Sequence, residues 1–479
     1  MTAQRLQTPG MHRLIQSPLG AVFDTKLFER IKSQGLYMEF ASARVGAAVL
    51  AAAGDVDAFL THLGGDIRPS PQLADRIHQG LARYEALKQR HDALVQTTQH
   101  YLWEGAASPD GGLAELETQR RAVGEQLIRP AKMLGFVMRR MKQAGVSAVR
   151  FETPTPENLW QQWGDAVAHP ARLYAAPAAP PAIEVSAAVA GPTGREYLIR
   201  FTSPAPFLGD TVYARVIEPE AASDALPTLI YGSGLGMPYD LIPYWPEENY
   251  LARPLAKYGC RTILIESPWH GRRTPRGYYT GEKYLATAPV GLFQLYAAQA
   301  QETAVLIQWA REIGASAVGV GGISLGGIVA QHVASRCQDW PSVMQPDMVF
   351  LGASSNMIDK VATSGEMAEI LGLDRALAAA GWTSAQLGRL RPVLDPLPSL
   401  GMSPDRVYGV FGTEDTYVPF AYAQTMLSGW GVPESNIMTW DVGHMGVLLK
   451  LFRTFDAQEL ILRGLAQASA ITHYEQPVC

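Results

Sequence analysis

One stretch of the sequence, residues 318–332, reads Val-Gly-Val-Gly-Gly-Ile-Ser-Leu-Gly-Gly-Ile-Val-Ala-Gln-His. The apolar residues before Ser324 predict a strand, and the residues after it predict an amphipathic helix. The pattern G-x-S-x-G at 322–326 is weak by itself, but a strand, a sharp turn and a helix are the context in which it carries a nucleophile. Glycines on both sides permit a strained turn that exposes the hydroxyl at a helix N-terminus, where backbone N–H groups stabilise negative charge. We predict that Ser324 is a catalytic nucleophile; the competing interpretation is a glycine-rich turn with an incidental serine.

The sequence around this turn alternates short apolar runs with helical stretches. We expect strands at 228–231, 262–265, 317–323, 348–351, 407–411 and 437–440, and helices at 290–312, 325–336 and 420–429. Continuous apolar strands separated by helices predict a mostly parallel sheet with helices on both faces. Before them, 197–201 and 212–216 alternate apolar with other residues around Gly209-Asp210, which predicts an antiparallel pair. Such a start followed by such a sheet is the layout of the α/β-hydrolase fold.

The acid and the base are predicted from their order along the chain. A serine hydroxyl needs an adjacent base, and on this fold Ser is followed by Asp or Glu and then by His. The strand at 407–411 runs into Gly412-Thr-Glu-Asp-Thr-Tyr-Val-Pro419, which matches the G-x-x-D-x-x-V-P turn of many α/β-hydrolases. Asp415 is the predicted acid, with Glu414 as the alternative. His444 is the predicted base, and Gly443 before it is expected to let the loop bend freely; the alternative is a histidine without a catalytic role.

A glycine-rich segment, Gly232-Ser-Gly-Leu-Gly236, follows the strand at 228–231. On this fold the loop after the third strand supplies one N–H group to the oxyanion hole, and the residue after the nucleophile supplies the other. We expect Leu325 as one donor and Ser233, Gly234 or Leu235 as the second, and the sequence leaves these three open. No G-K-[ST] continues the glycines, so a nucleotide-binding loop is disfavoured.

Three segments of the catalytic half share motifs with one family. They are Leu251-Ala-Arg-Pro-Leu-Ala-Lys-Tyr-Gly259 running into Thr262-Ile-Leu-Ile-Glu-Ser-Pro-Trp-His-Gly-Arg-Arg-Thr-Pro275, the turn at 322–327, and the Asp415 turn together with Gly443-His444. Over roughly 228–460 the chain resembles the family of alpha/beta hydrolase domain-containing protein eighteen. The resemblance implies the α/β-hydrolase fold and a Ser-Asp-His triad, and it does not specify a substrate.

The segment after the strand at 262–265 lies at the sheet edge where ligands bind in open α/β sheets. His270 and Arg272, with Arg273, are candidates for contact with an acidic group of the substrate. The alternative, which we favour, is that these charges fix the loop through ion pairs with Glu266 or Glu282.

A helical insert of the catalytic domain, at about 355–404, is expected to form a lid. Apolar residues would line an acyl pocket beneath it: Met357, Met367, Ile370, Leu371 and Leu373. Three tyrosines are expected to add an aromatic wall to the substrate site: Tyr278, Tyr279 and Tyr284. The alternative is that the helices of the insert only bury one another.

Composition divides the chain into three predicted parts. Residues 1–167 form a helical region, with amphipathic spacing at 71–103 and 113–143 and a break near Pro109. Residues 168–190 are rich in Ala and Pro and are expected to be a semi-rigid linker, and 191–479 form the catalytic domain. The helical region is expected to be a packing extension; a homodimer surface, a gating cap and a docking module are the alternatives.

The overall composition excludes several classes of protein. Hydrophobic residues at 47% fit a globular core, and a net charge of −5 gives no basic surface for nucleic acid. Cys260, Cys337 and Cys479 have neither disulfide nor metal-ligand spacing, so we predict a reducing compartment, no metal and no cofactor. The sequence shows no signal peptide and no apolar run of membrane-spanning length, so we expect a cytoplasmic protein without a transmembrane segment.

The predicted function is hydrolysis of a carboxylic ester or thioester through an acyl-enzyme, with a small acyl compound as substrate. Acyl transfer to an alcohol or amine, and cleavage of an amide, carbamate or carbon–carbon bond, use the same machinery and stay open. From a different class, the alternative is a non-catalytic scaffold that kept the fold.

Overall fold

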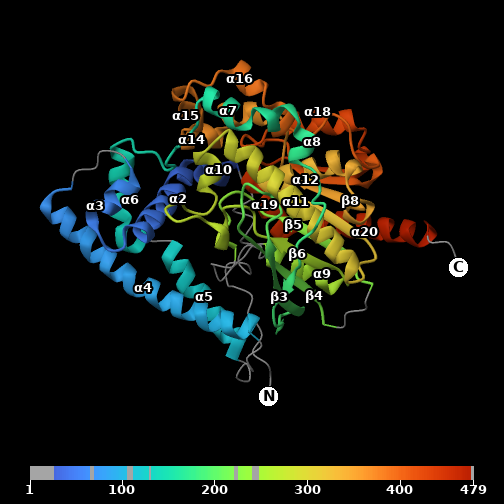
Figure 1. The fold of residues 1–479 in the computed structure, drawn as a ribbon, viewed down its shortest axis with the longest axis horizontal. Coiled ribbons are helices and arrows are strands. Elements are labelled where there is room, and N and C mark those ends of the chain that lie inside the picture. Colours follow the sequence, from blue (N-terminus) through green and yellow to red (C-terminus); the bar gives the residue numbers. More distant parts are fainter. Residues whose placement is uncertain are drawn as a thin grey trace.

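The structure is a computed structural model that describes residues 26–64, 69–104, 112–128, 131–220, 225–239 and 247–475. Figure 1 shows a central sheet between helices, with helices α2 to α6 extending to one side of it. Within the described ranges, no helix combines the length and the apolar character needed to cross a bilayer.

The sheet of the described residues has ten strands along the path β1-β3-β4-β6-β5-β7-β8-β9-β10, with β2 paired to β3. β4 pairs antiparallel with both β3 and β6, and each pair from β6 to β10 is parallel. The strands are β1 (Glu184–Val185), β2 (Val189–Ala190), β3 (Gly194–Thr202), β4 (Thr211–Pro219), β5 (Thr228–Gly232), β6 (Arg261–Ile265), β7 (Val318–Ile323), β8 (Met348–Gly352), β9 (Val407–Gly412) and β10 (Ile437–Trp440). The protein has the α/β-hydrolase fold, which confirms the fold predicted from its strand pattern.

The central strands are apolar throughout because both of their faces are covered. Every residue of β5 to β9 is buried. Side chains alternate between the two faces: Ile230 belongs to one hydrophobic cluster, and its neighbours Leu229 and Tyr231 belong to another. This two-sided burial is the physical reason that the apolar runs identify these strands in the sequence.

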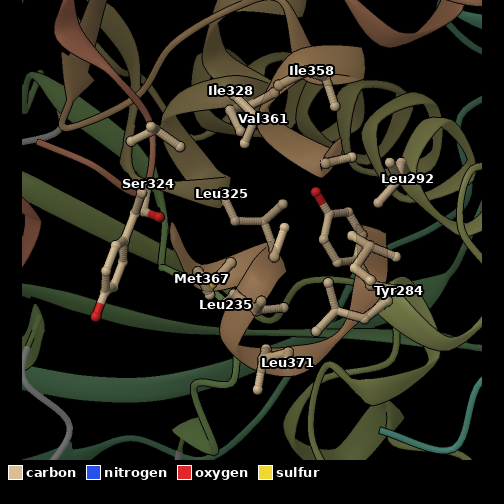
Figure 2. Close-up of a pocket in the computed structure, with 16 residues that line it drawn as sticks. Leu235, Tyr284, Leu292, Ser324, Leu325, Ile328, Ile358, Val361, Met367 and Leu371 are labelled. Atoms are coloured by element: carbon tan, nitrogen blue, oxygen red, sulfur yellow. The ribbon is translucent and has the colours of Figure 1, made fainter. Parts of the chain in front are cut away.

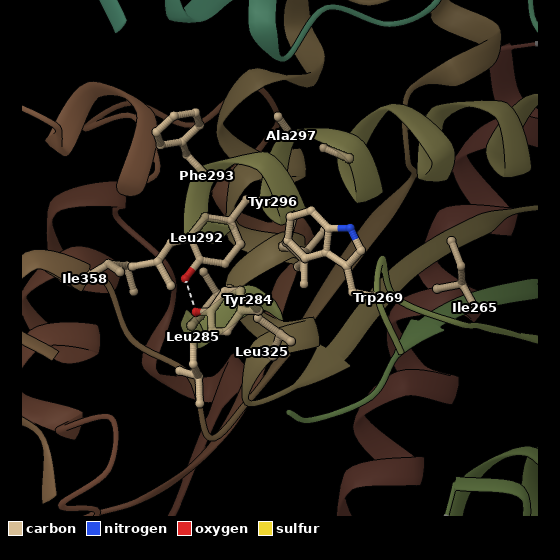
Figure 3. Close-up of a cluster of buried hydrophobic side chains, with 14 of the residues drawn as sticks. Ile265, Trp269, Tyr284, Leu285, Leu292, Phe293, Tyr296, Ala297, Leu325 and Ile358 are labelled. Atoms are coloured by element: carbon tan, nitrogen blue, oxygen red, sulfur yellow. Dashed lines mark hydrogen bonds between the residues drawn. The ribbon is translucent and has the colours of Figure 1, made fainter. Parts of the chain in front are cut away.

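Helices cover each face of the sheet. The first cluster holds side chains of α11 (Val290–Glu312), α12 (Leu325–Arg336) and α18 (Phe420–Trp430). Figure 3 shows part of this cluster, where the hydroxyls of Tyr284 and Tyr296 share a hydrogen bond of 2.6 Å. The second cluster holds side chains of α9 (Arg253–Lys257), α19 (His444–Arg453) and α20 (Asp456–Glu475).

The N-terminal helices share their core with the sheet. They are α2 (Lys26–Ala52), α3 (Val56–Leu63), α4 (Pro71–Trp103), α5 (Gly112–Ile128), α6 (Ala131–Gln143) and α7 (Pro156–Ala168). Ala41 and Val45 of α2 belong to the same hydrophobic cluster as Leu351 of β8. Trp163 of α7 packs edge-on against Phe293 of α11, with ring centroids 5.5 Å apart. The break predicted near Pro109 lies outside the described residues.

Residues 168–190, predicted to be a linker, are held against the catalytic half. They include α8 (Pro170–Leu173) and the short strands β1 and β2. The Tyr174 hydroxyl donates a hydrogen bond of 2.7 Å to the Val393 carbonyl, and the Trp340 indole donates one of 3.1 Å to the Tyr174 carbonyl. The Ala- and Pro-rich composition of residues 168–190 predicts a segment without long helices. It gives no sign of the contacts that hold this segment against the catalytic half.

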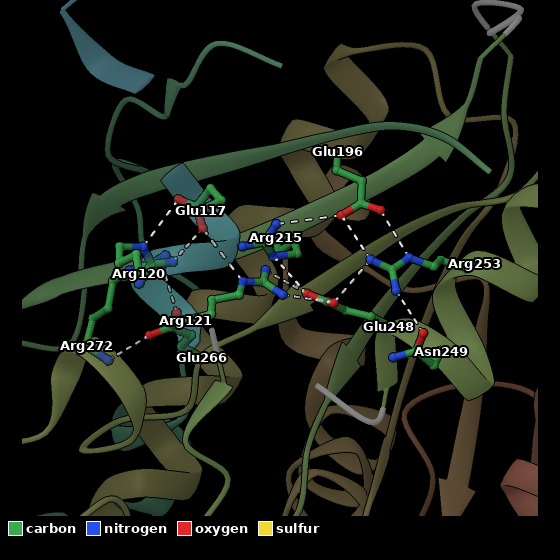
Figure 4. Close-up of polar contacts among 10 residues, drawn as sticks. All are labelled: Glu117, Arg120, Arg121, Glu196, Arg215, Glu248, Asn249, Arg253, Glu266 and Arg272. Carbon is green, nitrogen blue, oxygen red and sulfur yellow. Dashed lines mark hydrogen bonds and ion pairs between the residues drawn. The ribbon is translucent and has the colours of Figure 1, made fainter. Parts of the chain in front are cut away.

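A buried cluster of charges joins α5 to the sheet (Figure 4). Glu248, in the π-helical turn η3 (Glu248–Ala252), lies 3.1 Å from Arg121 of α5, 3.0 Å from Arg215 of β4 and 3.4 Å from Arg253 of α9. All four side chains are buried. Burial alone would raise the pKa of Glu248, but the three guanidinium groups hold it well below its usual value.

Glu248→Gln is expected to destabilise the protein by about 3–5 kcal/mol, because it removes the one carboxylate that all three buried arginines share and leaves, among the described residues, only Glu117 and Glu196 to compensate them. The midpoint of urea unfolding measures the loss. Asp92→Asn is the matched control, since Asp92 pairs with Lys88 at 2.5 Å while 49% of its side chain is exposed, and its cost should be below about 1 kcal/mol. Equal midpoints for the two variants would contradict a stabilising role for Glu248.

Candidate active site

The turn that carries Ser324 is strained, as the sequence predicts. Ser324 lies between β7 and α12 with a φ of 53° and a ψ of −115°, which is an uncommon conformation for a residue other than glycine. The close approach of α12 to the sheet requires its glycine neighbours: a Cβ atom added to Gly326 would collide with the Gly232 carbonyl, and one added to Gly322 would collide with the Gly326 backbone. The hydroxyl is thereby held at the N-terminal end of a buried helix.

The structure brings Ser324, His444 and Asp415 together in one hydrogen-bonded chain. The Ser324 Oγ donates to His444 Nε2 at 3.1 Å, and His444 Nδ1 donates to Asp415 Oδ2 at 2.7 Å. Asp415 follows β9, and His444 is the first residue of α19 after β10. The other carboxylate oxygen of Asp415 accepts hydrogen bonds of 2.9 Å from the N–H groups of Tyr417 and Val418. These bonds fix the carboxylate so that it faces the imidazole.

The alternative acid, Glu414, does not occupy this place. Its side chain is exposed, whereas Asp415 is only 6% exposed. Asp415 is the one of these two carboxylates that is buried and that accepts the hydrogen bond from His444.

The environment of His444 favours its charged form. Burial lowers the pKa of His444, but the charge and the hydrogen bond of Asp415, together with the charge of Glu29, raise it above its ordinary value of 6.5. The Tyr417 ring stacks on the imidazole with centroids 5.2 Å apart. An imidazole of this kind accepts a proton readily from a neighbouring hydroxyl.

The glycine-rich loop after β5 lies beside the nucleophile. A Cβ atom added to Gly234 would lie 3.6 Å from the Cβ of Ser324, so Gly234 is in contact range of the reacting residue. Leu325 is the first residue of α12, so its N–H group has no acceptor within the helix. Ser233 is buried and its carbonyl accepts a hydrogen bond of 3.0 Å from the Gly326 N–H. Leu235 points into the cavity beside Ser324 (Figure 2).

His270 contacts this loop and does not line the cavity. Its Nε2 accepts a hydrogen bond of 3.1 Å from the Gly236 N–H, and its Nδ1 donates one of 2.9 Å to the Pro268 carbonyl. Burial lowers the pKa of His270 to about 4, which keeps the ring neutral and able to accept. His270 thus holds the glycine-rich loop through neutral hydrogen bonds, whereas the structural alternative raised from the sequence was an ion pair with Glu266 or Glu282.

Arg272 is also engaged within the protein. Its side chain pairs with Glu266 at 2.9 Å, and its backbone N–H donates to the same carboxylate at 3.0 Å. Arg273 pairs with Glu302 at 2.7 Å. The ion pair between Arg272 and Glu266 is one of the two pairs that the sequence analysis gives as the structural alternative to substrate contact.

Tyr278 and Tyr279 lie apart from the cavity at Ser324. Both line a second cavity of about 810 Å3 between α2 and the segment 271–280. The Tyr278 hydroxyl donates to Glu152 at 2.6 Å, and the Tyr279 ring packs edge-on against Phe40 of α2. Of the three tyrosines expected to form one wall, only Tyr284 lines the cavity at Ser324.

The cavity beside Ser324 is narrow and apolar, with a volume of about 50 Å3 (Figure 2). Its wall includes residues of the insert between β8 and β9, which consists of α13 (Ile358–Ser364), α14 (Glu366–Leu371), α15 (Leu373–Ala379), α16 (Ser384–Gly388) and α17 (Arg391–Leu394). Met367, Leu371 and Leu373 line it as expected. Met357 lines a different cavity, next to α17, and Ile370 is not among the lining residues.

Two contacts of the site escaped prediction from the sequence. Tyr417 stacks on His444, but the motif of the Asp415 turn gives no sign of this contact. Glu29 of α2 contacts the start of α19, and no motif surrounds it in the sequence. Among the described residues, no group of three His, Cys, Asp or Glu side chains is placed to hold a metal ion.

Several esterases of known structure are similar to this chain at low sequence identity. The acetyl xylan esterase of Paenibacillus sp. R4 is 16% identical, covers 66% of this chain and 97% of its own, and has a TM-score of 0.44. Acetyl xylan esterase 1 of Thermoanaerobacterium sp. JW/SL YS485 is 16% identical over 63% of this chain and 96% of its own, with a TM-score of 0.41. A bacterial brefeldin A esterase is 16% identical over 67% of this chain and 87% of its own, with a TM-score of 0.37.

The sequence model of one family, alpha/beta hydrolase domain containing 18, matches residues 213–369. This range includes Ser324, the glycine-rich loop after β5 and the segment 266–275, and it ends before Asp415 and His444. The match confirms the resemblance predicted from the motifs: over these residues the chain is similar to the alpha/beta hydrolase domain containing 18 family.

Proposed function

We propose that the protein is a serine hydrolase that cleaves a carboxylic ester or thioester through an acyl-enzyme. The observation that carries this proposal is the hydrogen-bonded chain from the Ser324 hydroxyl to His444 Nε2 and from Nδ1 to Asp415. Nucleophile, base and orienting acid in this order are the arrangement that activates a serine for acyl transfer.

In the first half-reaction, the Ser324 oxygen attacks the carbonyl carbon while its proton passes to His444 Nε2. The negative charge that develops on the carbonyl oxygen is stabilised by the Leu325 N–H and by an N–H of the loop that contains Gly234. The tetrahedral intermediate collapses, the bond to the leaving alcohol or thiol breaks, and His444 returns the proton to that leaving group. Water then attacks the ester of Ser324, His444 takes its proton, and the carboxylic acid leaves as Ser324 regains its hydrogen.

The acyl group is placed in the apolar cavity beside Ser324, beneath helices α13 to α15, which serve as the lid. A cavity of about 50 Å3 holds only a few water-sized groups, which favours a short acyl chain. A cytoplasmic location remains a prediction from the sequence, and a homodimer through the N-terminal helices remains one of the alternatives for that region.

Ser324→Ala is expected to abolish turnover of p-nitrophenyl acetate above the background rate, because it removes the hydroxyl that donates to His444 Nε2. The wild-type protein should be modified by a fluorophosphonate probe at Ser324, as located by peptide mass spectrometry, and the variant should not. Ser335→Ala is a control, since Ser335 does not line the cavity at Ser324, and its hydroxyl donates to the His332 carbonyl and accepts from the Leu397 N–H. Undiminished turnover by Ser324→Ala would refute the proposed function.

Leu371→Ala is expected to shift the preferred acyl chain towards greater length, because it removes a side chain from the wall of the narrow cavity. The ratio of kcat/KM for p-nitrophenyl hexanoate to that for the acetate should rise by roughly tenfold, the effect of one or two methylene groups in an apolar pocket. Ile370→Ala truncates the neighbouring residue of α14, which does not line the cavity, and should leave the ratio unchanged. A ratio that rises equally in both variants would place the acyl chain elsewhere.

A further inference from the structure

We infer that Glu29, in the N-terminal helix α2, is a positioning residue for His444: its carboxylate caps the helix that begins at His444 and places a second negative charge beside the imidazole. This inference rests on the proposed function of Ser324 and His444. It gives the N-terminal helical region a part in catalysis, in addition to packing.

The contact between Glu29 and α19 takes the place of a helix cap. A helix leaves its first N–H groups without partners, and a carboxylate near them is favourable. The residue before α19 is Gly443, so the helix has no side-chain cap of its own. Glu29 Oε1 accepts a hydrogen bond from the Gly446 N–H, in the first turn of α19. A side chain of another element thus holds the turn that carries the base.

The two glycines of this turn leave room for the carboxylate. Gly443 was expected to let the loop bend freely, but its φ of −83° is one that any residue adopts. A Cβ atom added to Gly443 would lie 2.9 Å from the Glu29 Cδ, and one added to Gly446 would lie 2.9 Å from its Oε1. Gly443 is therefore needed because a side chain there would collide with Glu29. Its backbone conformation does not require a glycine.

A second contact holds α2 at the same place. Ser33, one turn after Glu29 on α2, donates a hydrogen bond to Glu366 of α14, and Thr416 donates to the other oxygen of that carboxylate. Thr416 lies between Asp415 and Tyr417, which both contact His444. Helix α2 is thus fixed to the loop of the acid as well as to the loop of the base.

The charges that face His444 come from two elements. Asp415 lies in the loop after β9 and Glu29 lies on α2, and both raise the pKa of the imidazole. Glu366 faces Tyr417 and Ser33 on the same side. Burial and the charge of Asp415 raise the pKa of Glu29 above its ordinary value, although the Gly446 N–H and the charge of His444 act in the opposite direction. An ionised Glu29 stabilises the imidazolium that forms when Ser324 loses its proton.

Glutamine separates this electrostatic role from a purely structural one. Glu29→Gln keeps an oxygen that accepts from Gly446 but removes the charge, and Glu29→Asp keeps the charge but shortens the side chain. The rate at which a fluorophosphonate probe modifies Ser324, measured from pH 5 to pH 9, follows the ionisation of His444 without requiring the natural substrate. Thermal unfolding shows that each variant is folded before its rate is measured.

In the wild-type protein the labelling rate should fall as the pH drops through a midpoint above 6.5, because the protonated imidazole is not a base. In Glu29→Gln the midpoint should move down by roughly one pH unit, since a nearby opposite charge is lost. In Glu29→Asp it should lie between the two. Glu39→Gln is the matched control, because it removes a carboxylate of the same helix that is 57% exposed and paired with Lys32, and it should leave the midpoint in place.

Midpoints of Glu29→Gln and Glu29→Asp that both equal that of the wild type would overturn the inference while Ser324 is still labelled. Absence of labelling at Ser324 in the wild-type protein would overturn the proposed function instead. The two failures are therefore distinguished within one series of measurements.

Discussion

The strained turn at Ser324 constrains the geometry of the whole site. Because its φ is 53°, the hydroxyl stands clear of the sheet, and α12 begins at once behind it. The helix approaches β5 so closely that neither Gly326 nor Gly232 has room for a side chain between them. This approach sets the position of the loop after β5 relative to the nucleophile, and the loops after β9 and β10 then bring their side chains to the same edge.

The N-terminal helices are bound to this framework by two different kinds of interaction. Apolar residues of α2 enter the hydrophobic cluster on one face of the sheet, and Arg121 of α5 enters a buried set of ion pairs with Glu248. Apolar packing is non-directional, whereas the ion pairs and their hydrogen bonds fix the register of a helix. Together they hold α2 at the distance from α19 that a carboxylate contact requires.

The fold and three of the site residues follow from local sequence, and the rest does not, for reasons that can be stated. Strands β5 to β9 are buried on both faces, so their sequences are apolar runs that can be recognised. Asp415 and His444 can be identified because each follows a predicted strand in the expected order. Glu29 and Gly446 are 417 residues apart, and neither the helix around Glu29 nor its charge distinguishes it from other surface carboxylates. Tyr278 and Tyr279 are close to Tyr284 in sequence, which is why all three are expected in one wall. In the structure Tyr278 and Tyr279 face α2 and line a different cavity. Contacts between segments that are far apart in the chain depend on how the whole molecule packs, so they leave no local pattern in the sequence.

The pKa values of the two histidines near the site are shifted in opposite directions. The charges of Asp415 and Glu29 raise the pKa of His444 above its ordinary value, whereas burial lowers the pKa of His270 to about 4. The bond from Gly236 to His270 therefore persists through the whole range in which His444 gains its proton. Acidification over that range protonates His444 while His270 still holds the loop beside Ser324.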